Sequence, residues 1–203
     1  VIMHFMFLIN SDFLSNLVQW LSMVFCLMNV SLITKKLSGN LNAQLISSLF
    51  CATIPMGILQ STGTQTDYVV SLWIISMVFF LISYLIDNKQ KYILGFAISL
   101  SLAILTKQTT YFFALPFCIW LFIYIFKSKP THIKYLFLIP LIILIINFGH
   151  SLRTYKTFGS PISSDNLGVK SEIINLQSIS SNIIRNISLN MSVPSAKINQ
   201  ITR

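Results

Sequence analysis

Asp67 is the acidic residue whose position in the sequence is most suggestive of chemistry. It closes the polar stretch Gln60-Ser-Thr-Gly-Thr-Gln-Thr-Asp67 and stands directly before a long apolar run that starts at Tyr68. A carboxylate at the mouth of a helix bundle can hold a divalent metal ion or act as a general base. The simpler interpretation is a helix N-cap shared with Thr66, and the sequence leaves both interpretations open.

Basic residues that lie close to the ends of apolar runs form the second set of candidates. They are Lys107, His150, Arg153 and Lys156. Cations at a boundary between lipid and water suit a phosphate-bearing ligand, because they supply charge-assisted hydrogen bonds. Basic residues also flank membrane helices without binding anything, so a structural role is an open alternative, above all for Lys107.

The composition indicates lipid as the main solvent of the chain. Hydrophobic residues make up 54% of the 203 residues and charged residues only 9%, whereas a soluble domain carries about 25% charged residues. The net charge of +9 does not indicate nucleic-acid binding, because the basic residues stand singly or in pairs between apolar runs. We therefore expect a membrane protein with no nucleic-acid partner.

Continuous apolar runs predict an all-α, polytopic transmembrane helix bundle of about six spans. The runs cover residues 13–34, 41–61, 68–86, 92–106, 110–126 and 133–150. They do not alternate with polar residues, which favours helices over barrel strands. The run 92–106 is short, about 22 Å of helix at 1.5 Å per residue. Such a span needs either a thinner bilayer or a Lys107 recessed in a cavity.

Lysine residues predict the orientation of the bundle. Those of the first, third and fifth loops are Lys35, Lys36, Lys89, Lys91, Lys127, Lys129 and Lys134, whereas the second and fourth loops hold only Lys107. Cytoplasmic loops are richer in Lys and Arg, so the lysine-rich loops are expected in the cytoplasm. Asp67, Lys107 and the residues after about 150 then face the extracytoplasmic side of the plasma or inner membrane.

The domain organisation follows from this orientation. We expect an external segment at residues 1–12, the bundle at 13–150 and an external segment at 151–203. Near-helical spacing of Ile, Leu and Met predicts an amphipathic helix at 171–191, lying on the membrane surface or packed on protein. Because the sequence begins with Val1, we expect it to be a fragment of a longer protein.

Four stretches together resemble one family of membrane enzymes. They run from Ala52 to Val70, from Gly95 to Thr109, from His150 to Pro161 and from Ser181 to Ser195. They look like the C-type integral-membrane glycosyltransferases, in particular the dolichyl-phosphate-mannose protein mannosyltransferase-like proteins and the aminoarabinose transferases. In that family the chain would begin near the end of the first external loop.

The resemblance implies an inverting glycosyltransferase that moves a sugar from a polyprenyl-phosphate donor to a protein, lipid or glycan acceptor outside the cell. Asp67 matches the second acidic position of the family, where it holds the donor phosphate or a divalent metal such as Mn²⁺ or Mg²⁺. Lys107 and Arg153 match basic positions that bind the phosphate, and His150 and Gln65 are further candidates for substrate binding. The catalytic base is expected upstream of Val1, since Asp12 does not match it.

A transporter or flippase for a lipid-linked or anionic substrate is the alternative function. It would use the same basic residues for binding, without chemistry. We would then expect charged side chains deeper in the spans and paired Gly/Pro-broken helices. The apolar runs are nearly free of charge, and Pro55, Pro116 and Pro140 are scattered along them. A non-catalytic membrane scaffold is a third interpretation.

Overall fold

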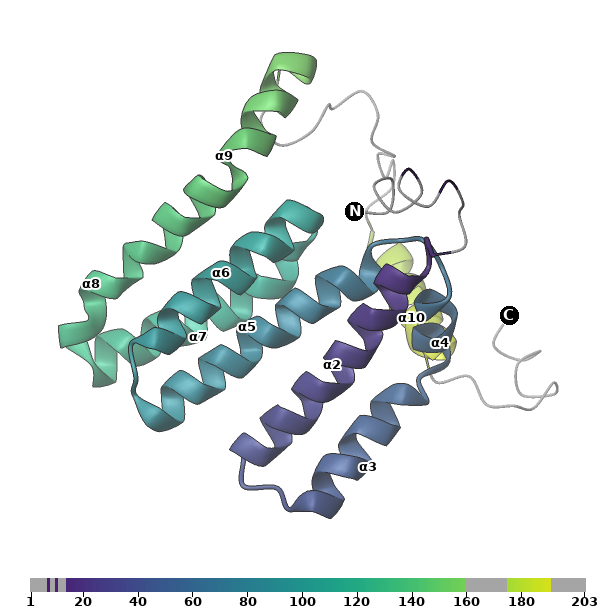
Figure 1. The fold of residues 1–203 in the computed structure, drawn as a ribbon, viewed down its shortest axis with the longest axis horizontal. Helices are drawn as coiled ribbons and strands as arrows, with labels where there is room; N and C mark the ends of the chain where they lie inside the picture. Colours follow the sequence, from purple (N-terminus) through teal and green to yellow (C-terminus); the bar gives the residue numbers. More distant parts are fainter. Residues whose placement is uncertain (1–6, 8–9, 11–13, 160–174, 191–203) are drawn as a thin grey trace.

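The computed structural model describes residues 7, 10, 14–159 and 175–190, and in these residues it contains helices and loops but no strand. The helices are α2 (Leu17–Lys36), α3 (Leu41–Ala52), α4 (Pro55–Ser61), α5 (Asp67–Asp87), α6 (Lys91–Thr106), α7 (Thr110–Ser128), α8 (Ile133–Leu136), α9 (Leu138–Phe158) and α10 (Leu176–Asn190), with a short 3₁₀ helix at Pro130–His132 before α8 (Figure 1). The prediction of an all-α fold is confirmed.

Helix α5 lies at the centre of the bundle, where it packs against α2, α6 and α7 (Figure 1). Its buried residues include Met77 and Leu81, whose side chains have no exposed surface. Helix α9 packs on α6 and makes the outer layer on that side. Asn147 fixes this layer, because its side-chain amide donates to the carbonyl oxygens of Ser101 (3.2 Å) and Ile143 (3.0 Å).

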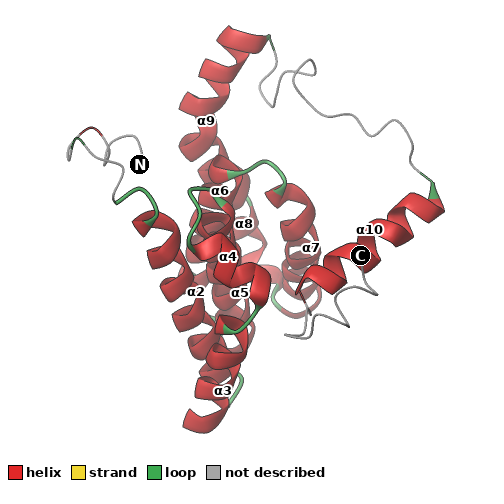
Figure 2. Cartoon of the chain, turned by 90° about the vertical axis from the view of Figure 1, so that its right-hand side faces the viewer, coloured by secondary structure: helices red, strands yellow, loops and turns green. Residues whose placement is uncertain are grey.

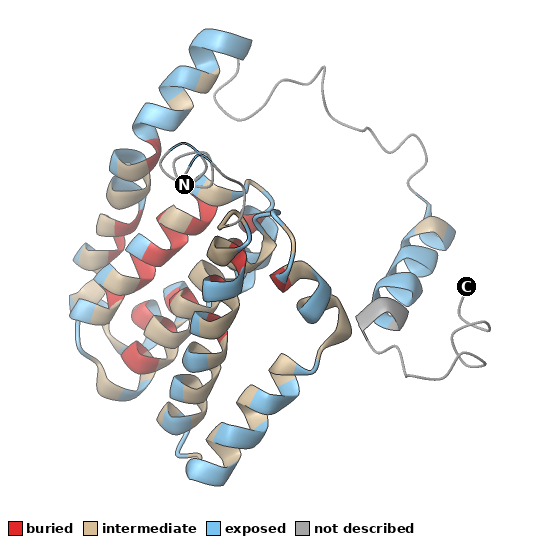
Figure 3. Ribbon diagram, turned by 45° about the vertical axis from the view of Figure 1, so that its right-hand side comes forward, coloured by how far each residue is buried: buried red, intermediate tan, exposed pale blue. Residues whose placement is uncertain are grey.

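Helix α6 is the most buried of the helices that cross the bundle. Phe96, Ala97 and Ala103 on this helix are at most 1% exposed. Gly95 lets α5 approach closely, since a Cβ there would lie 2.7 Å from the ring of Phe80. A helix of 16 residues is short for a bilayer. Its neighbours cover much of it, because eight of its residues are buried; Figure 3 draws the buried segments of the bundle in red.

The outer surface of the bundle is apolar. Exposed side chains include Phe50 (71%) on α3, Phe112 (81%) on α7 and Ile145 (64%) on α9. Soluble monomers rarely expose apolar surface on this scale. The long apolar helices and this surface together identify a multi-pass integral membrane protein.

The number of spans differs from the six expected. Among the described residues four helical segments are long and apolar enough to cross a membrane: Leu17–Lys36, Asp67–Asp87, Thr110–Ser128 and Pro130–Phe158. A fifth span exists if α3 and α4 are counted as one. Helix α6 is apolar but shorter than the other four, so the predicted run 92–106 exists as a helix of limited length.

The predicted continuous span 41–61 is wrong in detail, because the helix breaks after Ala52. Helices α3 and α4 meet at a bend of 71°. Pro55 is the first residue of α4; it has no N–H to donate, and its ring clashes with the preceding turn of a straight helix. The bend turns α4 across the end of the bundle, next to the start of α5 (Figure 2).

The described loops sort to the two ends of the bundle as the lysine pattern predicted. One end, called the lysine-rich end below, carries Lys35, Lys36, Lys89, Lys91, Lys127, Lys129 and Lys134 at or near helix termini. Hydrogen bonds join the helix termini there, such as that from Tyr124 Oη to Asn88 Oδ1 at 3.0 Å. Asp67 and Lys107 lie at the opposite end, at the start of α5 and the end of α6.

Helix α9 continues beyond residue 150, where the sequence predicted the bundle to end. It runs to Phe158 and stops at Gly159, whose φ of 74° is a left-handed conformation that glycine adopts without strain. Gly159 thus acts as the C-cap of α9, and the residues that follow it up to 174 lie outside the described ones.

An amphipathic helix follows, as predicted. Helix α10 covers Leu176–Asn190 of the expected 171–191, and its described side chains are mostly exposed. It contacts α4 and lies beside the main bundle (Figure 2).

Candidate functional site

Asp67 is the first residue of α5, and its carboxylate is not used as the helix cap. The N–H groups of Tyr68 and Val69 are bound instead by the side-chain oxygen of Gln19, at 3.1 and 3.3 Å. Thr66 makes no side-chain cap bond either. The interpretation of Asp67 as an N-cap is thus wrong. Its negative charge still lies at the positive end of the α5 dipole, and this interaction stabilises the ionised carboxylate.

Gln19 comes from α2 and is fully buried. Besides capping α5 it donates from Nε2 to the carbonyl oxygen of Gln60 at 3.4 Å, near the end of α4. One side chain thereby joins three helices and fixes the segment that precedes Asp67. Sequence reasoning missed it, because a single glutamine in an apolar run has no local signature.

Lys107 forms an ion pair with Asp67, with 2.6 Å between Nζ and Oδ1. Its backbone leaves α6 in an extended conformation (φ −156°, ψ 127°). The turn after it is held at the carbonyl oxygen of Ala103, which accepts from Lys107 N and from the hydroxyl of Thr110, each at 3.0 Å. The sequence therefore predicted correctly that Asp67 and Lys107 share one end of the bundle.

The ion pair is partly open to solvent. The side chain of Lys107 is 44% exposed and that of Asp67 is 34% exposed. Exposed ion pairs contribute little to stability, because solvent screens the attraction and two long side chains lose freedom. An anion with stronger charge can therefore compete with Asp67 for the ammonium group at little energetic cost.

A groove of about 670 Å³, called the α5–α7 groove below, runs from this ion pair along the bundle. Its lining residues are Asp67, Val70, Ser71, Ile74, Ile75, Val78, Lys107, Thr109, Phe113 and Phe117. On α5 they recur three or four residues apart, which is one face of a helix. From Asp67 to Val78 this face is about 16 Å long at 1.5 Å per residue. The groove is thus apolar along its length and charged at one end.

A smaller pocket of about 210 Å³, called the α4–α5 pocket below, also borders Asp67. It is lined by Ile54, Met56, Gly57, Gln60, Asp67, Tyr68 and Ser71. Asp67 and Ser71 line both cavities. Asp67 therefore borders both a long apolar groove and a small pocket with several polar side chains.

Residues 1–149 match the protein family described as dolichyl-phosphate-mannose-protein mannosyltransferase. The chain belongs to this family. Comparisons with curated proteins and with solved structures gave no match. Membership of the mannosyltransferase family implies a glycosyltransferase that uses a lipid-linked sugar donor. The family resemblance is thereby confirmed over a region that contains two of the four stretches, Ala52 to Val70 and Gly95 to Thr109.

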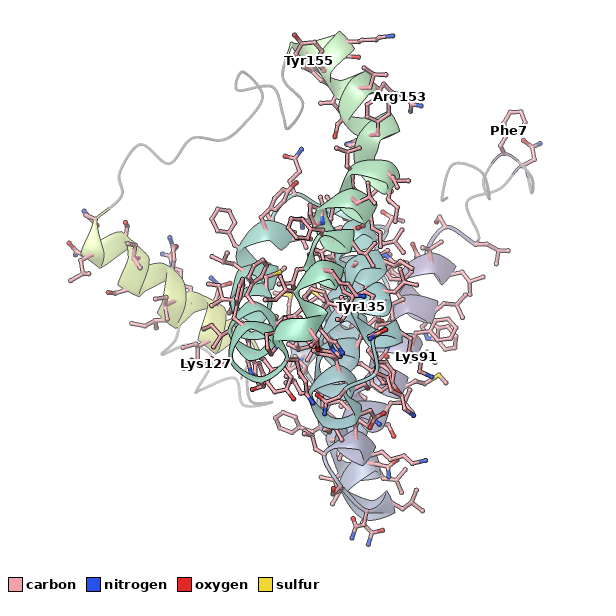
Figure 4. The ribbon with its side chains drawn as sticks, turned by 90° about the vertical axis from the view of Figure 1, so that its left-hand side faces the viewer. Phe7, Lys91, Lys127, Tyr135, Arg153 and Tyr155 are labelled. Atoms are coloured by element: carbon pink, nitrogen blue, oxygen red, sulfur yellow. The ribbon has the colours of Figure 1, made fainter. Side chains whose placement is uncertain are left out.

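The other predicted site residues lie apart from the ion pair. The match to the mannosyltransferase family ends before His150 and Arg153, which are exposed on the C-terminal turns of α9. Figure 4 shows Arg153 near the projecting tip of α9. Gln65 is exposed in the loop before α5. None of these three residues lines the groove or the pocket.

The predicted Mn²⁺ or Mg²⁺ site at Asp67 needs more ligands than the described residues supply. Within this part of the chain no group of three or more His, Cys, Asp or Glu side chains is close enough to hold a metal ion. The two described acids, Asp67 and Asp87, stand at opposite ends of α5, and Asp67 already faces a lysine. These residues alone do not fit a divalent metal.

Proposed function

We propose that the chain transfers a sugar from a polyprenyl-phosphate donor to an acceptor hydroxyl on the extracytoplasmic face of the membrane. The observation that carries the proposal is the α5–α7 groove, which is apolar along its length and ends at the ammonium group of Lys107. A polyprenyl phosphate has the same two parts in the same order, a long hydrocarbon tail and an anionic head.

The tail of the donor lies along the groove, against Ile74 and Ile75 of α5 and Phe113 and Phe117 of α7. Burial of apolar surface favours this placement by about 25 cal/mol for each Å² removed from water. In lipid the gain is smaller, so the groove positions the tail more than it supplies affinity. The charged head then decides which lipid is bound.

The phosphate binds Lys107, which exchanges its partner Asp67 for an anion of higher charge. Reaction breaks the bond between the anomeric carbon and the phosphate oxygen, and negative charge grows on that oxygen. The ammonium group stabilises this charge in the transition state. Asp67 keeps the lysine side chain at the mouth of the groove before the donor arrives.

The acceptor hydroxyl attacks the anomeric carbon from the side opposite to the phosphate, which inverts its configuration. Its proton passes to a general base, which we expect to be a carboxylate outside the described residues. The polyprenyl phosphate leaves along the groove. Arg153 and His150 belong to a part of α9 that projects beyond the other helices (Figure 4), and we propose that they contact the acceptor.

The extracytoplasmic placement is supported by the lysine-rich end of the bundle. Membrane loops with many lysines remain in the cytoplasm. The Asp67–Lys107 pair lies at the other end and would then face outward. Fusion of a reporter enzyme after Gly63 and after Asn88 tests this topology, since an extracytoplasmic reporter should be active only in the first fusion.

Two substitutions in the full-length, membrane-embedded enzyme test the proposal. Asp67→Asn and Lys107→Ala should each lower the rate of sugar transfer from dolichyl-phosphate-mannose by roughly 100-fold. Lys107→Ala removes the cation that stabilises the developing phosphate, and Asp67→Asn removes the carboxylate that holds this lysine at the mouth of the groove. Expression and membrane insertion should be unchanged. Lys129→Ala at the lysine-rich end is the matched control and should transfer at the wild-type rate. Wild-type rates in both test variants would contradict the assignment.

A transporter of lipid-linked or anionic substrates is the second candidate. The bend between α3 and α4 favours it, since broken helices line substrate sites in many transporters. It makes a different prediction for reconstituted vesicles, namely movement of fluorescent dolichyl phosphate between leaflets with no sugar transfer to any acceptor. Membership of the mannosyltransferase family favours transfer.

A further inference from the structure

The α4–α5 pocket is not needed to explain how a polyprenyl tail or a phosphate would bind. Its volume of about 210 Å³ is less than a third of that of the α5–α7 groove. Sites for drug-sized ligands measure about 300–1,000 Å³. The pocket therefore suits a single small group and not a chain.

Its lining differs in chemistry from that of the groove. Gln60, Asp67, Tyr68 and Ser71 bring an amide, a carboxylate and two hydroxyl groups to a small volume. Such side chains both donate and accept hydrogen bonds. A compact group with several hydroxyls, such as a pyranose ring, matches this lining better than an apolar group or a second anion does.

The pocket is also shaped by one close approach. A Cβ at Gly57 would lie 2.6 Å from Tyr68 Oη, closer than side-chain atoms pack, and 3.7 Å from Cζ of the same ring. Glycine at this position therefore lets the tyrosine hydroxyl lie directly over α4. Any larger residue must push the ring away from its position in the pocket wall.

We propose that the α4–α5 pocket is the glycosyl subsite, which holds the sugar of the polyprenyl-phosphate donor while its tail lies in the α5–α7 groove. The inference rests on the proposed function and adds the place where the sugar is recognised. Asp67 and Ser71 are walls of both cavities. A donor whose phosphate is bound at Lys107 thus has its next group, the sugar, beside the pocket.

This placement gives Asp67 a second partner. When the phosphate takes Lys107, the carboxylate of Asp67 is released from its ion pair and can accept hydrogen bonds from sugar hydroxyls. Hydrogen bonds to a charged acceptor are stronger than those between neutral groups. Held in this way, the sugar keeps its anomeric carbon next to the phosphate at Lys107 and leaves the opposite face to the acceptor.

Binding to two probes, dolichyl-phosphate-mannose and dolichyl phosphate, tests the subsite in the full-length protein in lipid nanodiscs. The two lipids differ only in the sugar. Gly57→Ala should weaken binding of dolichyl-phosphate-mannose by about 10-fold or more, as expected when a pocket loses room for part of its ligand, and should change binding of dolichyl phosphate less than about twofold. Gly63→Ala is the matched control, since its added Cβ meets only Gln60 O at 3.6 Å and Gln65 N at 3.9 Å.

A second variant keeps the test decisive if Gly57→Ala fails to fold. Tyr68→Phe removes one oxygen atom and should weaken dolichyl-phosphate-mannose binding by roughly 3- to 10-fold, the effect of one net hydrogen bond. Equal weakening for both lipids, or no effect in either variant, overturns the subsite and leaves the groove and Lys107 as the donor site. Failure of the wild-type protein to bind either lipid contradicts the proposed function itself.

Discussion

The two ends of the bundle each carry a lysine–aspartate ion pair between helices, and the two pairs differ in how completely they are satisfied. At the lysine-rich end, Lys36 Nζ binds both oxygens of Asp87, at 2.9 and 2.8 Å. The hydroxyl of Tyr92 donates to the same carboxylate at 2.9 Å. At the other end, Lys107 reaches one oxygen of Asp67, and the pair opens onto the α5–α7 groove, while Asp67 also lines the α4–α5 pocket.

The Lys36–Asp87 pair serves to hold two helices together, whereas the Asp67–Lys107 pair is available to a ligand. The side chains of Lys36 and Asp87 are 27% and 21% exposed, against 44% and 34% for Lys107 and Asp67. Lys36 also lies 5.9 Å from the centre of the Tyr92 ring, a further stabilising contact. Both oxygens of Asp87 are thus engaged, and one of them accepts a second hydrogen bond, whereas in the described contacts Lys107 engages a single oxygen of Asp67.

The largest expected effect is that one lysine is needed for sugar transfer and the other for stability. Lys107→Ala should lower sugar transfer by roughly 100-fold and leave the midpoint of thermal unfolding nearly unchanged. Lys36→Ala should lower that midpoint by a few degrees, because Asp87 loses its bidentate partner, and should leave transfer close to wild type. Transfer assays and thermal unfolding in the same detergent measure both quantities. Equal losses of stability in the two variants would remove the distinction between the pairs.

Filling the groove should give the next largest effect. Ile75→Trp places a large ring in the α5–α7 groove and should raise KM for a long-chain donor by about 10-fold, with a smaller change for a donor with a short tail. Ile119→Trp is the matched control, since Ile119 is 49% exposed on α7 and does not line the groove. If both variants change KM alike, the groove is not the site of the tail.

Gln19 should give the smallest effect, because it acts on the site through the position of α5. Gln19→Leu removes the acceptor for Tyr68 N and Val69 N and should cost about 1 kcal/mol of stability, the typical loss of a helix cap. Transfer should fall only a few-fold, because the Asp67 carboxylate is still present and only its position at the start of α5 becomes less well fixed. Chemical unfolding and transfer assays measure the two effects, and a loss of transfer as large as that of Lys107→Ala would mean that Gln19 touches substrate.

Much of the site could be predicted from the sequence, because it depends on the alternation of helices across a membrane. Asp67 and Lys107 are 40 residues apart, yet each follows or precedes an apolar run on the same side, so their meeting is a consequence of topology. The run lengths also predicted a short α6, and the spacing of Ile and Leu predicted α10.

The remaining features depend on tertiary contacts that leave no local trace. A proline such as Pro55 can be accommodated within a membrane helix or can break it. The packing of α4 near the start of α5 favours the broken form, with its bend of 71°. Residues 151–158 contain no glycine or proline, so α9 continues until Gly159 and carries Arg153 away from Lys107. The cap by Gln19 joins residues 49 and 50 positions apart in the sequence.

The most direct test of the central claim is photo-labelling with dolichyl phosphate that carries a diazirine in its tail, mapped by mass spectrometry on the full-length protein in nanodiscs. We expect labels on the α5 and α7 faces that line the groove, at residues such as Ile74, Ile75, Phe113 and Phe117. Lys107→Ala should reduce this labelling, and unlabelled dolichyl phosphate should compete with it. Labels spread evenly over the exposed faces of α3 and α9, unchanged by Lys107→Ala, would contradict the account.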